Sequence, residues 1–156
     1  WLEKAEESAD ITIALPHWGP EYQLTHSQEQ EATALWLINK GADAIIGSHP
    51  HVVQDTTTLK SVQVAYSLGN AVSNMSATNT QVELMATMRI VKDSTGKCRI
   101  LPIEYTWLWC SRPGGFRDDY TIIPIEQYID SKEQWKGQWE YDKMINTYNR
   151  IKYKKQ

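Results

Sequence analysis

Two short apolar runs separated by a helix-like segment constrain the fold of this chain more than any other feature. Residues 11–15 and 43–47 have the length and β-branched content of buried strands. Between them, Ser27 is a good helix N-cap, and apolar residues recur at helical spacing until Gly41. A strand, helix and strand within roughly 40 residues predict a βαβ unit with a right-handed crossover. The two strands should therefore be parallel and end at the same edge of a sheet.

The remainder of the chain is predicted to form strands and then a helix. Residues 62–66 predict a third strand, and the preceding link is too short for a helix, so an antiparallel or irregular connection is expected. Residues 81–91 and 98–107 flank a turn-rich segment, which indicates a β-hairpin. Residues 112–119 predict a loop. A C-terminal amphipathic helix is predicted from about residue 138, with an apolar stripe formed by Tyr141, Met144, Ile145, Tyr148 and Ile151. The fold class is α/β.

Composition excludes some classes of protein. The 156 residues carry 16 Lys and Arg against 19 Asp and Glu, a net charge of −3, which argues against a nucleic-acid binder. No apolar run approaches the roughly 18 residues of a membrane span, so this stretch is expected to be soluble. Cys98 and Cys110 are too few for a disulfide scaffold. Basic residues gather in residues 132–156, where a solvated helix face and a contact with an anionic polymer or membrane are the alternatives.

Three of the four histidines directly follow the two predicted parallel strands. His17 comes after the first strand, and His49 and His51 come after the second. Ligand sites in open α/β sheets form outside the carboxyl ends of the strands. Because imidazole is a frequent ligand for Zn, Mn, Fe, Ni and Cu ions, the pattern predicts a metal or anion site, with packed or exposed histidines as the alternative. His26 lies at a helix start and is expected to be structural.

Aromatic and acidic neighbours extend this prediction. Glu21 and Tyr22 follow the His-Trp-Gly turn, where they can orient His17 or hydrogen-bond a ligand. The alternative is that Glu21 is a surface turn residue and that the Tyr22 ring packs against the helix. Four tryptophans are predicted to pack in the core or hairpin, with a sugar-stacking surface as the alternative: Trp107, Trp109, Trp135 and Trp139.

Three motifs resemble one known family. Residues 9–22 (ADITIALPHWGPEY), 41–54 (GADAIIGSHPHVVQ) and 65–70 (AYSLGN) resemble the CapA-like family of capsule and poly-γ-glutamate biosynthesis proteins. The domain of that family is similar to calcineurin-like metallophosphoesterases. The motifs occur in the order and at the spacing of the family, whereas residues 81–156 match only its general layout. The resemblance implies a partial α/β/β/α sandwich.

The resemblance also implies a domain organisation. Residues 1–156 would be the C-terminal part of a single metallophosphoesterase-fold domain whose N-terminal part is absent. The chain begins at Trp1 without an initiator methionine, which fits this expectation.

The resemblance implies a site for divalent metals such as Mn, Zn or Fe. In the superfamily, the positions matching His17 and His49 share one metal and the position matching His51 serves a second one. Ser67 and Asn70 are expected to line the pocket wall, and Trp18 and Glu21 to bind a ligand or support the metal ligands. No segment resembles the family's earlier motifs, a bridging Asp and an Asn-His pair. The sequence therefore predicts half of a dinuclear site, and metal binding by this stretch alone is expected to be weak or absent.

The implied function is a role in bacterial capsule or poly-γ-glutamate biosynthesis. Two alternatives are a metal-dependent phosphoesterase when full length, with this stretch inactive by itself, and a non-catalytic structural or polymer-binding module. The expected partners are an anionic envelope polymer or a phosphorylated precursor, with no nucleic acid, and a homo-oligomer through an exposed sheet edge. The expected location is the cell envelope or the extracellular space, with membrane association of the full-length protein.

Overall fold

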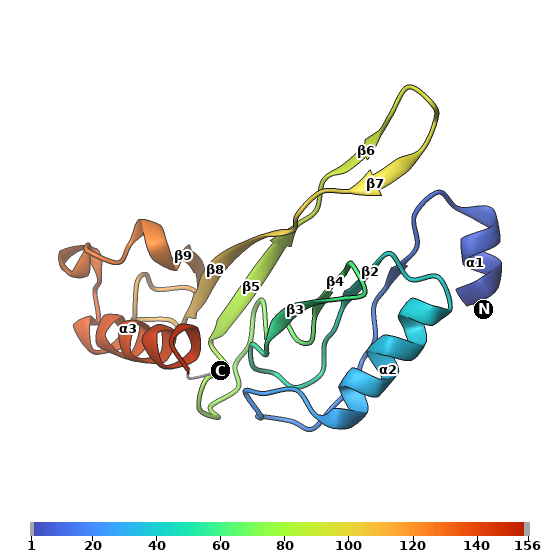
Figure 1. The fold of residues 1–156 in the computed structure, drawn as a ribbon. Helices are drawn as coiled ribbons and strands as arrows, with labels where there is room; N and C mark the ends of the chain where they lie inside the picture. The colour runs from blue at the N-terminus through green and yellow to red at the C-terminus, as the bar shows by residue number, and fades with distance from the viewer. Residues whose placement is uncertain (1, 155–156) are drawn as a thin grey trace.

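The computed structural model describes residues 2–154, so Trp1 and residues 155–156 lie outside the description. Two helix-covered sheets lie side by side, and a two-stranded ribbon projects from them (Figure 1). The elements are α1 (Leu2–Ser8), β1 (Ile13–Ala14), α2 (Gln28–Asn39), β2 (Ala44–Ile46), β3 (Thr56–Leu59), β4 (Val62–Ala65), β5 (Val82–Thr87), β6 (Ile90–Lys92), β7 (Cys98–Ile100), β8 (Glu104–Ser111), β9 (Thr121–Pro124), the 3-10 helices η1 (Ile125–Gln127) and η2 (Lys132–Gln134), and α3 (Gln138–Lys152). The predicted mixed α/β class, with its C-terminal helix, is confirmed.

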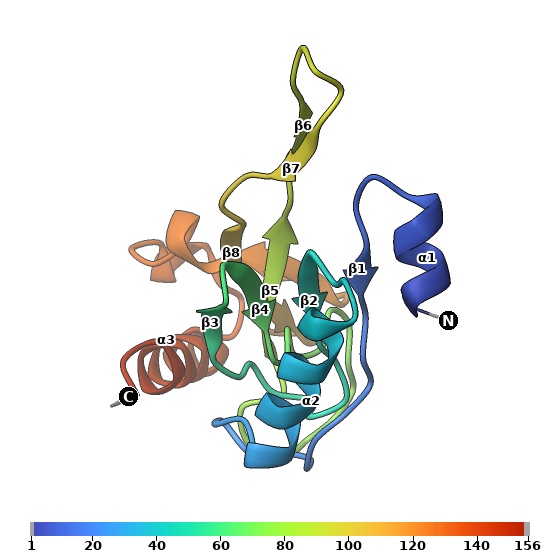
Figure 2. The same ribbon diagram turned by 45° about the vertical axis from the view of Figure 1, so that its right-hand side comes forward.

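The first sheet has the strand order β1-β2-β4-β3, and it contains the predicted βαβ unit. β1 pairs in parallel with β2, which pairs in parallel with β4. The predicted N-cap Ser27 starts α2, and it forms a capping box with Gln30: the Ser27 hydroxyl accepts from the Gln30 amide, and the Gln30 side chain accepts from the Ser27 amide. The helix covers one face of this sheet (Figure 2).

The first strand is shorter than predicted. Residues 11–15 were expected to be extended and paired, but only Ile13–Ala14 form β1. The Thr12 amide donates instead to the Asp43 carboxylate at 2.7 Å, and Pro16 has no amide hydrogen to continue the ladder. The strand therefore ends just before the loop that carries His17.

A strand that the sequence did not predict lies in the link between β2 and β4. β3 pairs antiparallel with β4, so the antiparallel form of the expected connection is confirmed. The turn of this hairpin is Lys60–Ser61, and both residues have positive φ, 47° and 72°. Such turns usually carry Gly, Asn or Asp, and their absence here explains why no hairpin was predicted at this point.

The second sheet has the order β5-β8-β9, and α3 packs against it. The predicted hairpin of residues 81–107 is confirmed, but it is divided into two pairings: β5 with β8, and β6 with β7 at the projecting tip. The core between this sheet and α3 contains Trp109 and Trp135, as predicted, together with Met144, Tyr148 and Ile151 from the predicted helical stripe. Trp139 does not follow the packing prediction, because its side chain is 62% exposed. Among the described residues, no helix is long and apolar enough to cross a membrane.

Candidate metal site

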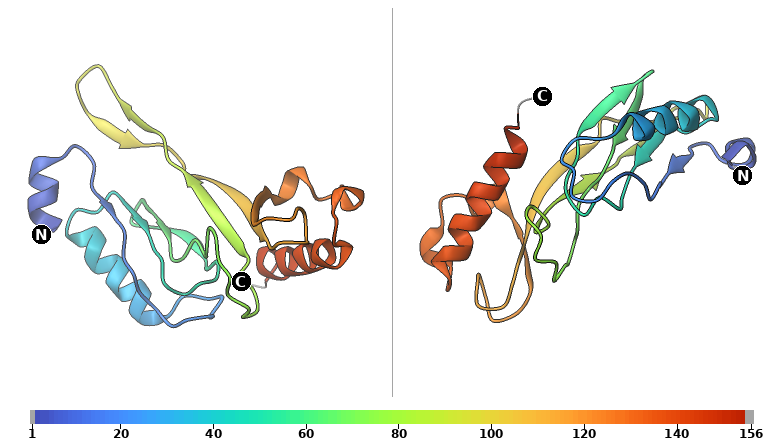
Figure 3. Two further views of the ribbon diagram at one scale, coloured as in Figure 1. Left: turned by 180° about the vertical axis from the view of Figure 1, so that it is seen from behind. Right: turned by 90° about the horizontal axis from the view of Figure 1, so that it is seen from below.

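The loops after β1 and β2 run side by side at one end of the first sheet, the end opposite the projecting ribbon (Figure 3). His17 and Ser48 form an isolated parallel bridge, which continues the β1–β2 pairing beyond the strands. The Trp18 amide donates to the Ser48 carbonyl at 3.0 Å, and the Ser48 amide donates to the Pro16 carbonyl at 2.9 Å. The predicted convergence of the histidine loops at one sheet edge is therefore present.

Glu21, His49 and His51 form a compact donor group within this end of the sheet. One ligand atom from each of the three side chains lies within 4.8 Å of the others. The Glu21 Oε1 atom lies 3.8 Å from His51 Nε2. One carboxylate oxygen and two imidazole nitrogens suit Zn, Mn or Fe ions, so the residues fit a divalent metal.

His17 lies beside this group. Its ring centroid is 4.5 Å from that of His49, but His17 is not a member of the three-residue cluster. The structure thus brings together the three histidines predicted from the sequence and adds a carboxylate. Glu21 was expected only to support or bind a ligand, and no sequence spacing distinguishes it as a metal ligand, because its approach depends on the fold of the loop after His17.

Asn70 orients the His51 ring. Its side-chain amide nitrogen donates to the carbonyls of His51 and Thr80, both at 3.2 Å, which leaves its Oδ1 atom to accept from His51 Nδ1 at 2.9 Å. His51 then keeps Nε2 free on the side of Glu21. On the neighbouring loop, the Ser48 hydroxyl lies 3.3 Å from His17 Nδ1. Ser67 is fully buried, and its hydroxyl accepts from the Gly69 amide at 3.3 Å, which supports the turn that carries Asn70.

Replacing Asn70 with alanine is expected to weaken divalent-metal binding by about 10–100-fold, because His51 loses the partner that orients its ring. Isothermal titration with Mn and Zn measures the change. Asn39→Ala, on an exposed helix end, is the matched control and should bind metal like the parent chain. Equal affinities for the Asn70→Ala chain and the parent would contradict this role.

Three residues of the site have positive φ. His49, His51 and Tyr22 have φ of 101°, 60° and 64°, in a region that residues other than glycine rarely adopt. Such conformations cost roughly 1–3 kcal/mol each and cluster at functional sites. The Tyr22 amide donates to the Pro50 carbonyl at 2.8 Å, and its ring stacks on His51. Desolvation, followed by the adjacent Glu21 carboxylate, raises the pKa of the Tyr22 phenol.

Trp18 and His26 support the loops of the site through contacts with Tyr66. The Trp18 indole donates to the Tyr66 carbonyl at 2.8 Å, so Trp18 anchors the loop. The His26 ring stacks on Tyr66 with centroids 3.9 Å apart and lies 2.9 Å from Asp55, which agrees with its expected structural role. Desolvation raises the pKa of Tyr66 to about 12. At Asp55, desolvation acts to raise the pKa, but hydrogen bonds from Lys154 and His26 outweigh it and lower the value.

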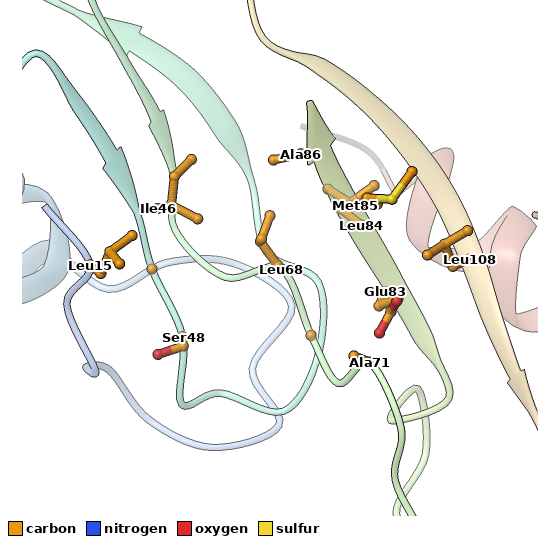
Figure 4. A pocket seen from close by; sticks show the side chains of 12 residues that line it. Leu15, Ile46, Ser48, Leu68, Ala71, Glu83, Leu84, Met85, Ala86 and Leu108 are labelled. Atoms are coloured by element: carbon orange, nitrogen blue, oxygen red, sulfur yellow. The ribbon is translucent and has the colours of Figure 1, made fainter. Parts of the chain in front are cut away.

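An apolar groove that was not predicted from the sequence lies next to these loops. It has a volume of about 660 Å³ and lies between the first and second sheets (Figure 4). The residues lining it include Leu15, Ile46, Leu68, Met85 and Glu83. The Glu83 residue is only 6% exposed, and its Oε2 atom has no hydrogen-bond partner. Burial raises the pKa of this carboxyl to about 7. The sequence feature that could have indicated this buried carboxyl is the single Glu in the otherwise apolar run of residues 82–86.

Comparison with known proteins places the site in a family context. Residues 1–75 match the family model described as "Bacterial capsule synthesis protein PGA_cap". The "PGA biosynthesis protein CapA" of Bacillus subtilis (strain 168) is 32% identical over 103 residues, which are 66% of this chain and 27% of that protein. The "Capsule biosynthesis protein CapA" of Bacillus anthracis is 34% identical over 97 residues, 62% of this chain and 24% of that protein. The chain therefore spans about a quarter of the length of these relatives.

Proposed function

We propose that this chain carries part of a protein that takes part in capsule or poly-γ-glutamate biosynthesis in the cell envelope, because residues 1–75 match the family model of bacterial capsule synthesis proteins. The family match confirms the predicted resemblance to CapA-like proteins. The motifs of the donor group and of Asn70 all lie within the matched residues.

We also propose that residues 1–156 are the C-terminal part of one metallophosphoesterase-like domain. The open groove between the two sheets supports this organisation. Leu15 and Met85 line it and are 73% and 49% exposed, and apolar surface of this kind is usually covered by further protein.

The donor group of Glu21, His49 and His51 carries the functional proposal: this end of the sheet holds a divalent cation and receives a phosphorylated or otherwise anionic ligand. A bound divalent cation would polarise a phosphoryl oxygen or lower the pKa of a bound water. The chain's own contribution is positional. Asn70 sets the His51 ring, the backbone of the two loops sets their spacing, and the His17 ring lies beside His49 as a further donor.

Metal titration of the chain tests this proposal. The histidines alone predicted weak or absent metal binding, but Glu21 adds a carboxylate to them. The chain, freed of metal with a chelator, should therefore bind Mn or Zn at close to one ion per molecule. His51→Ala and Glu21→Gln should each weaken binding at least tenfold, since each removes one of three donors. Glu133→Gln, an equal charge change at an exposed position, should have no effect.

Two results would contradict the metal proposal. One is the absence of uptake of either ion by the parent chain in elemental analysis. The other is retention of parental affinity by both substituted chains. If a chain extended to the relatives' length also took up no metal, the metal proposal would be replaced by the alternative of a non-catalytic structural or polymer-binding module.

A further inference from the structure

Most cations near α3 are neutralised by carboxylates from other elements. The predicted basic C-terminal helix is therefore less positive than its sequence indicates. The lysines concerned and their carboxylate partners are Lys132 with Asp142, Lys136 with Asp118, Lys152 with Glu126, and Lys154 with Asp55.

Lys143 and Arg150 differ from these lysines. Lys143 Nζ donates to the side-chain carbonyl of Gln81, and Arg150 donates from Nε and Nη2 to Asn79 Oδ1 at 2.9 and 2.7 Å. Both acceptors are neutral amides. Within residues 2–154, no salt bridge joins either cation to a carboxylate. Their positive charges therefore remain available to an anion.

These two cations line a polar groove between α3 and the segment before β5. The groove has a volume of about 420 Å³. Trp139, Lys143, Asn146 and Arg150 follow one another at spacings of three or four residues, so they share one face of the helix. On the opposite wall lie residues 76–79, with two hydroxyl side chains. The groove thus combines charge, hydrogen-bonding groups and an exposed aromatic ring.

Two acidic side chains, Asp142 in the lining of the groove and the buried Glu140, are already engaged. Both oxygens of Asp142 accept from Lys132, at 2.6 and 2.8 Å. Glu140 is fully buried and accepts from the Gln81 side chain, the Ser111 hydroxyl and the Arg112 amide. Desolvation and then the Arg112 guanidinium lower the pKa of Lys143, although the Glu140 carboxylate acts in the opposite direction. The surroundings of Lys143 therefore include the positive charge of Arg112 as well as the buried carboxylate of Glu140.

We propose that this groove binds a flexible polyanion that carries carboxylates along its length. Lys143 and Arg150 are seven residues apart, which is roughly 10 Å along a helix, too far for one carboxylate to contact both. The ligand must therefore present at least two anionic groups. The Arg150 guanidinium can pair with one carboxylate in a two-pronged contact, and Lys143 can pair with another.

Two other groups on this face of α3 suit the connecting part of such a chain: Asn146, between the two cations, and Trp139, one turn before Lys143. Asn146 can hydrogen-bond a backbone amide of the polymer, and the Trp139 ring, 62% exposed, offers an apolar surface to its methylene groups. The choice of poly-γ-glutamate as the probe rests on the proposed function, whereas the groove itself is argued from its charges. The site is separate in the sequence from the histidine loops.

Binding of fluorescein-labelled poly-γ-glutamate, followed by anisotropy, tests the groove. The parent chain should bind the polymer, and added salt should weaken binding. The double variant Lys143→Gln/Arg150→Gln should lose at least tenfold in affinity. The double variant Lys97→Gln/Arg99→Gln removes the same charge from the exposed β6–β7 ribbon and should stay within twofold of the parent.

A second variant separates the groove from an effect on folding. Asn146→Glu places a negative charge at an exposed groove position without removing any of the contacts described, and it should also lose about tenfold. Thermal unfolding of each variant confirms that it is folded. Equal losses in the groove and ribbon variants, or no loss in Asn146→Glu, would overturn the proposal.

Binding measurements with two further polymers, α-linked polyglutamate and polyphosphate, identify the anion. Binding of α-linked polyglutamate that is lost in the same variants supports a carboxylate groove, whereas tighter binding of polyphosphate overturns the carboxylate assignment. Failure of the parent chain to bind any glutamate polymer also overturns it. The metal titration is run on the same sample, so failure of the groove and failure of the metal proposal are read separately.

Discussion

Replacing Gly47 with alanine is expected to lower the free energy of unfolding by about 3–5 kcal/mol and to abolish metal binding at the candidate site. A Cβ atom at this position would lie 2.1 Å from the Tyr66 carbonyl oxygen and 2.4 Å from Trp18 Nε1. These two groups are hydrogen-bonded to each other, and the Gly47 amide donates to the Ala65 carbonyl at 2.7 Å. The strand cannot move away without breaking the sheet that carries the histidine loop.

Urea unfolding and metal titration measure both effects. Gly114→Ala is a suitable control, because no atom lies within 4 Å of its added Cβ and only its φ of +83° is unfavourable. That control should lose about 1–2 kcal/mol. If the Gly47→Ala chain kept the urea midpoint and the metal affinity of the parent, the histidine loop would not depend on the close approach of Gly47 to Tyr66 and Trp18.

The second large effect concerns the pH dependence of stability at Glu83. Burial raises the pKa of its carboxyl from 4.5 to about 7. Between these values the folded chain holds a proton that the unfolded chain releases, so the free energy of unfolding falls as the pH rises, and the loss is complete above pH 7. The full difference corresponds to about 3 kcal/mol.

Glu83→Gln should remove this pH dependence, because an amide does not titrate. Urea unfolding at pH 4.5 and pH 8.5 measures this effect. The free energy of unfolding of the variant, relative to that of the parent, should be about 3 kcal/mol higher at pH 8.5 than at pH 4.5. Glu133→Gln, at an exposed position, should show no such gain. A Glu83→Gln effect that is the same at both pH values would mean that the carboxyl is not protonated in the folded chain.

The local patterns predicted the elements that depend on neighbouring residues. Ser27 and Gln30 define the start of α2 through a capping box, and the apolar stripe through Met144 and Tyr148 correctly placed α3. These signals act over three or four residues, so the sequence shows them directly. The Lys60–Ser61 turn lacked such a signal, and the strand β3 before it was missed for that reason.

The candidate site was predicted in part. The order of strand, helix and strand places His17 near His49 and His51, because parallel strands end at one edge of a sheet. The contribution of Glu21 depends on the positive φ of Tyr22 and on its hydrogen bond to Pro50, which bring the loop back over His51. This hydrogen bond joins residues that are far apart in the sequence. The charge of the groove at α3 likewise depends on which lysines meet distant carboxylates.

Sequence alone predicted the βαβ unit, the capped helix, the hairpin and the resemblance of three motifs in residues 9–70 to one family, because periodicity, capping and motif spacing are properties of neighbouring residues. The packing of the fold sets which donors join the histidines, leaves the Glu83 Oε2 atom buried without a hydrogen-bond partner, and directs Lys143 and Arg150 to neutral amides. These features could not be predicted because burial and electrostatic pairing depend on distances across the fold. Those distances are set when the two sheets and α3 pack, not by the spacing of residues along the chain.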